Sequence, residues 1–222
     1  WSSDVCSSDL PGLVHQPCAG AHEELAPALR QVRVAQGLGI AVLLPVGDQR
    51  KGRRTAQRAL LVGQQVPMAC GVAFAQKHRK TDGVVIAFFG DGALQQGAIH
   101  ESFNMAGIWD LPIVFVLENN KYGMGTAIER VSALTPDAHK MASSYKFEHA
   151  AFDGMNLLES YDAFTMAIEH ARKHQRPYFL EARCSRFRGH SMSDPGKYRT
   201  KGMLEDEKAT EDDRPCLHLC LF

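Results

Sequence analysis

Residues 83–93, with the sequence GVVIAFFGDGA, decide the fold class of this chain of 222 residues. The first seven positions are rich in β-branched and aromatic side chains and contain no charge, which is typical of a strand buried on both faces of a parallel sheet. A second such run occupies residues 111–117, and residues 98–108 between the two runs carry apolar side chains at helical spacing. The pattern predicts an α/β fold, a mostly parallel sheet flanked by helices, with polar residues at the carboxyl ends of the strands.

Three more helices are predicted from spacing and from capping residues. The pattern changes from Ala59 onward, and one helix is predicted over residues 66–77, where small and apolar residues recur at helical spacing. Pro136 is placed to begin a second helix with Thr135 as its cap, and Ser160 is placed to cap a longer helix over residues 161–174. The face of the first helix consists of Val66, Ala69, Cys70, Ala73, Phe74 and Lys77, and the face of the helix over residues 98–108 consists of Ile99, Phe103 and Ala106.

The predicted organisation is one domain between two irregular ends. Residues 1–58 are interrupted by prolines and hold at best one marginal helix, over residues 21–37, so they are expected to be a weakly ordered or non-native arm. Residues 59–208 are the expected domain and residues 209–222 an irregular tail. Inside the domain, a predicted strand over residues 178–184 opens into a polar loop of more than a dozen residues, a length typical of functional or disordered loops.

Composition disfavours nucleic acid and membrane partners. The 25 basic and 25 acidic side chains cancel, so no overall field attracts a nucleic acid or an anionic membrane. The apolar stretch over residues 37–46 is about half as long as a membrane helix requires. Cys70 and Cys184 lie inside apolar patterns, as expected for buried thiols of a reduced intracellular protein. The other cysteines lie near the ends of the chain, and a zinc site at Cys216-Leu217-His218-Leu219-Cys220 is disfavoured because no second ligand pair follows.

Polar residues at two predicted strand ends suggest a metal and phosphate site. Asp91, between Gly90 and Gly92, follows the first strand, and the pair Asn119-Asn120 follows the second, 28 and 29 residues beyond Asp91. Mg²⁺ binds oxygen ligands and often shares them with a diphosphate. The Asp91 carboxylate, an asparagine amide oxygen and a backbone carbonyl just beyond it would supply three such ligands. The glycines allow a phosphate to approach the backbone, and the amino end of the helix near residue 98 would offset its charge.

The spacing and flanking strings resemble the thiamin-diphosphate motif. Over residues 61–208 the chain looks like the alpha subunits of the decarboxylating first component of pyruvate dehydrogenase, in the 2-oxo-acid dehydrogenase family. The strings that carry the resemblance are DGA (91–93), FNMA (103–106), Trp109, LP (111–112), ENN (118–120), YGMGT (122–126) and RGHSMSDP (188–195). The resemblance implies a thiamin-diphosphate-binding fold.

The resemblance implies site residues position by position. Asp91, the side chain of Asn120 and the main-chain carbonyl of Tyr122 would be Mg²⁺ ligands. Backbone groups at Gly90, Gly92 and Ala93 would meet the diphosphate. Val62 matches the position whose backbone meets the aminopyrimidine, and His190 matches a loop histidine that reaches the diphosphate side of the active site and is the expected catalytic residue. Those expected cofactor-binding residues are Val62, Gly90, Asp91, Gly92, Ala93, Asn120, Tyr122 and His190.

The resemblance also implies the reaction and the partners. Similar enzymes decarboxylate a small 2-oxo acid on thiamin diphosphate and transfer the acyl group to a lipoyl group on a partner acyltransferase core, with the cofactor supplying most of the chemistry. They are heterotetramers of two alpha and two beta subunits, and the beta subunit provides the glutamate that activates the aminopyrimidine. Glu101 and Glu118 are therefore expected to be packing or hydrogen-bonding residues. The expected compartment is the cytoplasm of a bacterium, or the mitochondrial matrix if the source is eukaryotic.

Alternatives remain open at this stage. An acetoin or branched-chain 2-oxo-acid dehydrogenase is the nearest one, although the strings YGMGT and HSMSDP favour pyruvate. A non-catalytic fragment that only pairs with a beta subunit is another, because the amino-terminal Tyr-Arg pair and the carboxyl-terminal helices of the family are not recognisable. A dinucleotide-binding protein is disfavoured because no G-x-G-x-x-G follows the first strand. Ser191 matches a regulatory phosphorylation position of the family, where a phosphate would place like charge beside the diphosphate.

Overall fold

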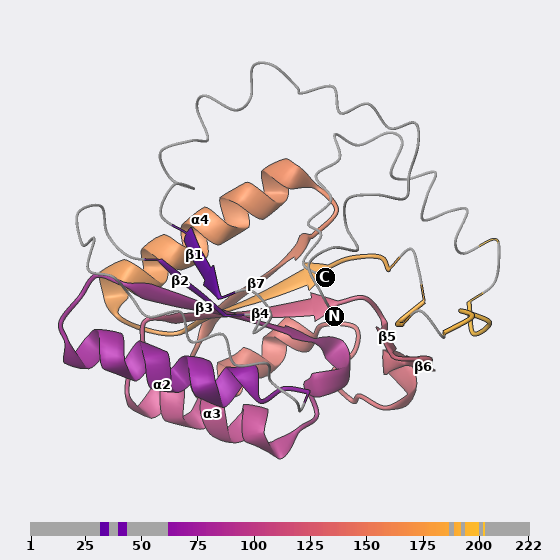
Figure 1. The fold of residues 1–222 in the computed structure, drawn as a ribbon, viewed down its shortest axis with the longest axis horizontal. Coiled ribbons are helices and arrows are strands. Elements are labelled where there is room, and N and C mark those ends of the chain that lie inside the picture. The colour runs from indigo at the N-terminus through magenta and orange to yellow at the C-terminus, as the bar shows by residue number, and fades with distance from the viewer. Residues whose placement is uncertain are drawn as a thin grey trace. The chain divides into compact units, whose positions relative to one another are not determined.

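One sheet of six strands dominates the part of the chain that the computed structural model describes, namely residues 62–186, 189–191, 194–199, 202 and two short strands before them. Its strand order is β1-β2-β3-β4-β8-β7 (Figure 1). The pairs β3–β4, β4–β8 and β7–β8 are parallel, while β1–β2 and β2–β3 are antiparallel. The strands are β1 (Val32–Ala35), β2 (Ile40–Leu43), β3 (Val84–Gly90), β4 (Ile113–Asn119), β7 (Glu148–Asp153) and β8 (Tyr178–Arg183).

Helices cover both faces of the sheet, and this confirms the predicted α/β fold with a mostly parallel sheet. Figure 1 shows α2 (Gln65–His78) and α3 (Gly97–Ile108) on one side of the strands and α4 (Leu157–His174) on the other. A 3₁₀ helix, η3 (Ala138–Tyr145), packs on the same face as α2 and α3. The remaining short elements are η1 (Asp91–Ala93), β5 (Tyr122–Gly123), β6 (Thr126–Ala127) and η2 (Ile128–Arg130).

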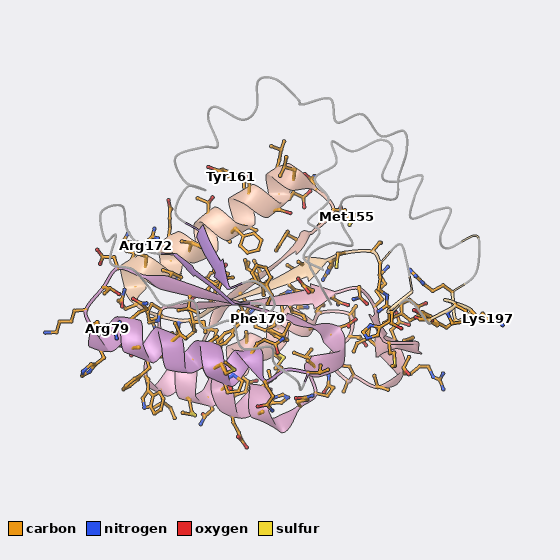
Figure 2. The ribbon with its side chains drawn as sticks, viewed as in Figure 1. Arg79, Met155, Tyr161, Arg172, Phe179 and Lys197 are labelled. Carbon is orange, nitrogen blue, oxygen red and sulfur yellow. The ribbon has the colours of Figure 1, made fainter. Side chains whose placement is uncertain are left out.

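Two hydrophobic cores explain why the strands are apolar at nearly every position. Alternate residues of a strand point to opposite faces, so a strand covered on both sides has no exposed face. In β3, Val85, Ala87 and Phe89 belong to the core under α2 and α3, whereas Val84 and Ile86 belong to the core under α4. Figure 2 shows Phe179, from β8, in the middle of the molecule. The predicted helix-face residues Ile99, Phe103, Ala106, Val66, Ala69, Cys70 and Ala73 are all buried, but Phe74 is exposed.

The order of the parallel strands places a switch point between β4 and β8. The crossover from β3 to β4 runs through α3 on one face, and the crossover from β7 to β8 runs through α4 on the other face. Such crossovers are right-handed. Because the two helices lie on opposite faces, the step from β3 to β4 and the step from β7 to β8 run in opposite directions across the sheet. Ligands of open α/β sheets bind outside the carboxyl ends of the strands at such a point.

Two predicted helix starts are wrong. Helix α4 begins at Leu157, not after Ser160, because the Asn156 side chain accepts hydrogen bonds from the backbone N–H groups of Leu158 (3.1 Å) and Glu159 (3.3 Å) and so caps the helix one turn earlier. The helix expected to begin at Pro136 is the 3₁₀ helix Ala138–Tyr145 instead. Strand β7 was not predicted, since it is a half-buried edge strand with no clear apolar alternation.

The amino-terminal stretch contributes strands that the sequence did not indicate. Part of the marginal helix expected over residues 21–37 is strand β1, which pairs with β2, and β2 pairs with β3. The described residues all belong to one unit, Val32–Phe222. The rest of the predicted arm, the tail over residues 209–222, and the cysteines at both ends lie outside the described residues. Among the helices that are described, none has the length and apolar character needed to cross a membrane.

Candidate functional site

The loops that follow β3 and β4 meet at the carboxyl edge of the sheet. The two strands are parallel neighbours, and Gly90 lies opposite Glu118 in their register. A Cβ atom added to Gly92 would lie 3.2 Å from Cα of Gly123, so a side chain at either position would force the other backbone to shift by a few tenths of an ångström. The structure thus brings together the two segments in which the sequence predicted metal and phosphate ligands.

Asp91 is the most unusual group at this edge. Its side chain is 2 % exposed, and its Oδ1 accepts a hydrogen bond of 2.8 Å from the backbone N–H of Gly92. Its Oδ2 is buried and has no hydrogen-bond partner among the described residues. Burial raises the pKa of the Asp91 carboxyl, and the Gly92 hydrogen bond offsets part of that rise. Smaller offsets come from the charge of Arg186 and from the backbone N–H groups of Lys121 and Tyr122.

The asparagine pair shapes the second loop through two successive turns. Asn119 Oδ1 accepts a hydrogen bond from the Lys121 N–H, and Asn120 Oδ1 accepts one from the Tyr122 N–H, both at 3.1 Å. Lys121 and Met124 adopt left-handed backbone conformations, with φ of 68° and 58°. These turns hold Asn120 and Tyr122, the predicted metal ligands, in the loop that adjoins Asp91.

The turn before α2 lies beside the same edge. Gly63, at a φ of +85°, is packed so that an added Cβ would lie 2.7 Å from the Gln96 side chain and 3.5 Å from Cβ of Ala93. Val62, next to it, is 68 % exposed. The predicted aminopyrimidine position and the predicted diphosphate position are therefore neighbours, although they are about thirty residues apart in the chain.

The loop after β8 packs on the β5–β6 hairpin through Arg186 and Tyr198. The Arg186 Nη2 donates to the Met124 carbonyl at 2.6 Å and to the Tyr198 hydroxyl at 2.7 Å. The Tyr198 ring lies 5.3 Å from the Tyr122 ring, centroid to centroid. His190, the predicted catalytic residue, is exposed, with its Nδ1 3.3 Å from Arg186 Nη1. The structure therefore links His190 to the site through Arg186.

Asp194 organises this loop. Its carboxylate accepts hydrogen bonds from the His190 N–H (2.7 Å), the Gly196 N–H (2.9 Å) and the Tyr198 hydroxyl (2.8 Å). These bonds, of which those from Gly196 and His190 have the largest effect, lower the pKa of Asp194 to about 2. Ser191 is exposed within the segment that Asp194 ties down. Figure 2 shows Lys197 at the outer end of the molecule, on the same loop.

Arg186 is a site residue that the sequence analysis missed. Its charge lowers the pKa of Asp91, and its Nε is buried without a hydrogen-bond partner among the described residues. Its position in the sequence could have indicated this role, because it lies three residues beyond the end of β8, at the edge of the sheet where the other polar residues gather. It brings a cation to a site that the sequence alone left short of positive charge.

Two buried glutamates lie at the same ends of the strands. Burial raises the pKa of Glu118 to about 7, and no donor contacts its carboxylate among the described residues. Glu181 is fully buried and hydrogen-bonded to Asn119 and His139. Burial raises the pKa of the Cys184 thiol to about 12, and the nearby charges of Glu118 and Asp91 raise it further. The expectation that Glu118 is a packing residue around the site fits its burial, whereas Glu101 is exposed.

The donor set fits a hard cation bound with a diphosphate. It offers a buried carboxylate oxygen without a partner, an amide oxygen and a backbone carbonyl, and such oxygen ligands suit Mg²⁺. Within the described part of the chain no three His, Cys, Asp or Glu side chains form a metal-binding group. A cation here would need the backbone and a bound phosphate to complete its shell.

Comparison with known proteins gives one family. The family model described as "Dehydrogenase E1 component" matches residues 28–218, which extends further at both ends than the range over which the resemblance is visible in the sequence.

Curated relatives share this region. The pyruvate dehydrogenase E1 component subunit alpha of Rickettsia bellii is 44 % identical over 148 residues, which are 67 % of this chain and 45 % of the relative. The protein of the same name from Zymomonas mobilis is 42 % identical over 162 residues, 73 % of this chain and 46 % of its own. A mitochondrial, testis-specific form from Rattus norvegicus is 42 % identical over 153 residues, 68 % of this chain and 38 % of the relative. The chain therefore spans less than half the length of these relatives.

Solved structures match more weakly. A transketolase mutant from Pichia stipitis has a TM-score of 0.46 at 23 % identity, over 55 % of this chain and 19 % of the transketolase chain. A putative thiamin diphosphate-dependent enzyme from Mycobacterium smegmatis has a TM-score of 0.43 at 26 % identity, over 57 % of this chain and 23 % of its own.

Proposed function

This chain belongs to the dehydrogenase E1 component family, and from that premise we propose that it acts as an alpha-type subunit in the decarboxylation of pyruvate on thiamin diphosphate. The observation that carries the proposal is the buried, unpartnered Oδ2 of Asp91, which lies where the loops after β3 and β4 meet. An ionised carboxylate is costly to bury unless it is paired or bound to a metal. A cation at this position removes that cost.

The roles that we assign to the chain are those that the resemblance implies, and the geometry supports them. Asp91, the Asn120 side chain and the Tyr122 carbonyl hold Mg²⁺. The backbone at Gly90, Gly92 and Ala93 meets the diphosphate, and the space beside Gly90 is open, since an added Cβ there would meet no atom within 4 Å beyond its chain neighbours. The exposed Val62 turn, packed beside Ala93, offers its backbone to the aminopyrimidine.

His190 and Arg186 act from the loop that follows β8. The Arg186 guanidinium supplies positive charge near Asp91 and touches His190, so the two side chains stabilise phosphate or substrate oxygen by hydrogen bonding. Thiamin diphosphate, when bound, supplies the carbanion chemistry that releases carbon dioxide from a 2-oxo acid. The chain's own part is to orient the cofactor and to hold these donors in place.

The partners that we propose are those of the curated relatives. Their name, E1 component subunit alpha, implies a beta subunit, and we assign to that beta subunit the carboxylate that activates the aminopyrimidine. The acyl group then passes to a lipoyl group of an acyltransferase core. The relatives are bacterial proteins and a mitochondrial form, so we assign the bacterial cytoplasm or the mitochondrial matrix as the compartment.

Pyruvate is preferred over the alternatives for two reasons. The strings YGMGT and HSMSDP favour it over acetoin and branched-chain substrates, and the curated relatives described above carry pyruvate in their names. The competing possibility from another class is a chain that pairs with a beta subunit and binds no cofactor.

Coexpression of the full chain with a beta subunit of the family tests the proposal. We expect thiamin diphosphate to bind only with Mg²⁺, as measured by calorimetry, and Asp91→Asn to weaken that binding by about a hundredfold, since a direct ligand matters at least as much as the residues that support it. The matched control is Asp110→Asn, at the opposite, amino-terminal edge of the same strands, which should bind as the unmodified complex does. A complex that forms without binding the cofactor would favour the non-catalytic alternative.

A further inference from the structure

Glu181 follows three buried aromatic and aliphatic residues of strand β8, Tyr178, Phe179 and Leu180, and it is itself fully buried. It lies on β8 with its side chain on the same face of the sheet as the core under α2 and α3, as its alternation with Phe179 and Leu180 shows. A buried carboxylate is stable only if donors surround it. Three hydrogen-bond donors do so: the Asn119 Nδ2 at 2.8 Å, the His139 backbone N–H at 2.9 Å and the His139 Nδ1 at 2.8 Å. The Arg183 Nε adds an ion pair, at 3.6 Å from Glu181 Oε1.

The hydrogen bonds of Glu181 continue into the loop after β4. Glu181 Oε1 accepts from the Asn119 amide nitrogen, and the Asn119 amide oxygen accepts from the Lys121 N–H. The next residue, Asn120, makes the second turn by accepting from the Tyr122 N–H. A chain of hydrogen bonds therefore runs from η3 through β8 and β4 to the loop that adjoins Asp91.

The two ends of this chain fix its polarity. At one end the His139 backbone N–H is a donor, and at the other end the Lys121 backbone N–H is a donor, and neither can exchange its role. Each of these two N–H groups needs an acceptor. The Asn119 amide oxygen accepts from the Lys121 N–H, which leaves the Asn119 NH₂ group as a donor toward residue 181. Residue 181 must therefore accept from both Asn119 and His139, which a carboxylate can do and an amide cannot.

We propose that Glu181 is a positioning residue, which fixes the amide orientation of Asn119 and so holds the turn that presents Asn120 and Tyr122 to the cation and diphosphate. The role of these two residues as ligands rests on the function proposed above, whereas the turn itself depends only on the hydrogen bonds. His139 has a part in the same arrangement, because its backbone and ring tie the start of η3 to the Glu181 carboxylate.

Exchanging the amide of residue 119 and the carboxylate of residue 181 tests the proposal. In Glu181→Gln the new amide must turn its oxygen to His139, so that its NH₂ faces the NH₂ of Asn119. In Asn119→Asp two buried carboxylates face each other. The double variant Asn119→Asp with Glu181→Gln restores one donor between two acceptors and keeps the net charge of the original pair.

The experiment uses the full chain coexpressed with a beta subunit, in these three variants. The first readout is amide hydrogen exchange of Lys121 and Tyr122 without cofactor, and the second is the Mg²⁺-dependent affinity for thiamin diphosphate. We expect each single variant to speed that exchange and to weaken binding by about ten- to a hundredfold, the usual effect of losing a residue that orients metal ligands. The double variant is expected to recover most of both losses.

The control is Glu169→Gln, the same carboxylate-to-amide change at an exposed position of α4, which should alter neither readout. The proposal would be overturned if Glu181→Gln left both amide exchange and cofactor affinity unchanged. It would also be overturned if the double variant performed no better than the single variants, or did not fold. Rescue of a misfolded Glu181→Gln by the second substitution would support it. If the unmodified complex bound no cofactor, the function proposed above would fail, but the exchange data would still decide the role of Glu181.

Discussion

At the scale of single residues, burial of carboxylates at the strand ends distinguishes this site. Asp91 and Glu118 both have raised pKa values because burial disfavours their charged forms, while Glu181 is buried with three donors around it. The first two therefore reduce the stability of the cofactor-free protein at neutral pH. Such a cost is common at functional sites, where stability is exchanged for function.

Glu118 gives a prediction for the pH dependence of stability. Its pKa is about 7 in the folded chain against 4.5 for the ordinary group, so between these values the folded protein binds a proton that the unfolded chain does not. Stability should then fall as the pH rises from 4.5 to about 7, and level off above it. Glu118→Gln should remove this fall and be more stable at pH 8 by on the order of 2–3 kcal/mol.

Urea unfolding of the cofactor-free chain at a series of pH values measures this effect. The control is Glu101→Gln, an exposed glutamate of α3, which should leave the pH profile unchanged. A Glu118→Gln profile that still falls over the same range would contradict the assignment of the fall to this carboxyl.

The site residues that spacing predicts without the resemblance follow consecutive strands. Asp91 and Asn120 follow β3 and β4, which are neighbours in the chain and in the sheet, so the meeting of their loops could be predicted from the spacing. Glu181 lies on β8 and Arg186 follows it, and the sequence has no signal that β8 lies next to β4. Their roles depend on a pairing between distant parts of the chain.

At the scale of elements, the loop after β8 depends on a single carboxylate. Asp194 accepts from two backbone N–H groups and one hydroxyl, and Arg186 joins the loop to the β5–β6 hairpin. The stabilising effect of Asp194 is complete above its ordinary pKa of 3.8 and is lost as the pH falls toward about 2. At neutral pH the loop around His190 is therefore held by an ionised Asp194.

Asp194→Asn should loosen this loop at neutral pH. An amide has only one oxygen, so it leaves at least one of the three donors facing an NH₂ group. We expect cleavage by trypsin after Lys197 to become about fivefold faster, because the loop opens more often. The control is Asp162→Asn on the exposed side of α4, and equal cleavage rates for the two variants would contradict the role given to Asp194.

Element types were easier to predict than element ends. The strands over residues 83–89, 111–117 and 178–184 were predicted because both of their faces are buried and every position is informative. The start of α4 was predicted wrongly, because Asn156 and Ser160 are both good capping residues. Only the backbone conformation around Asn156 decides between them. Strand β7 was missed because one of its edges and part of its surface are exposed.

At the scale of the whole molecule, the sheet separates two cores of unequal aromatic content. Phe103 of α3 is fully buried and packs against the rings of Phe89, Phe115 and Phe179 in the core under α2 and α3. In the core under α4, Phe164 is only partly buried. The two cores should therefore respond differently to the same substitution.

Phe103→Ala should destabilise the chain by about 3–5 kcal/mol, because it removes a ring from a close-packed cluster and leaves a cavity. Phe164→Ala is the matched control on the opposite face and should cost about half as much, since part of that ring is already exposed. Urea unfolding of the full chain measures both. Equal losses would show that the two cores are equally tight.

The sequence by itself determined the α/β class, the strand-helix-strand unit around residues 83–117 and the meeting of the loops that follow its two strands. These follow from local periodicity and from the rule that parallel strands end at one edge of a sheet. Only the tertiary structure decided that β8 inserts between β4 and β7, and with it the positions of Glu181 and Arg186. Strand order depends on packing between segments distant in the chain, and periodicity within one segment carries no information about its neighbours.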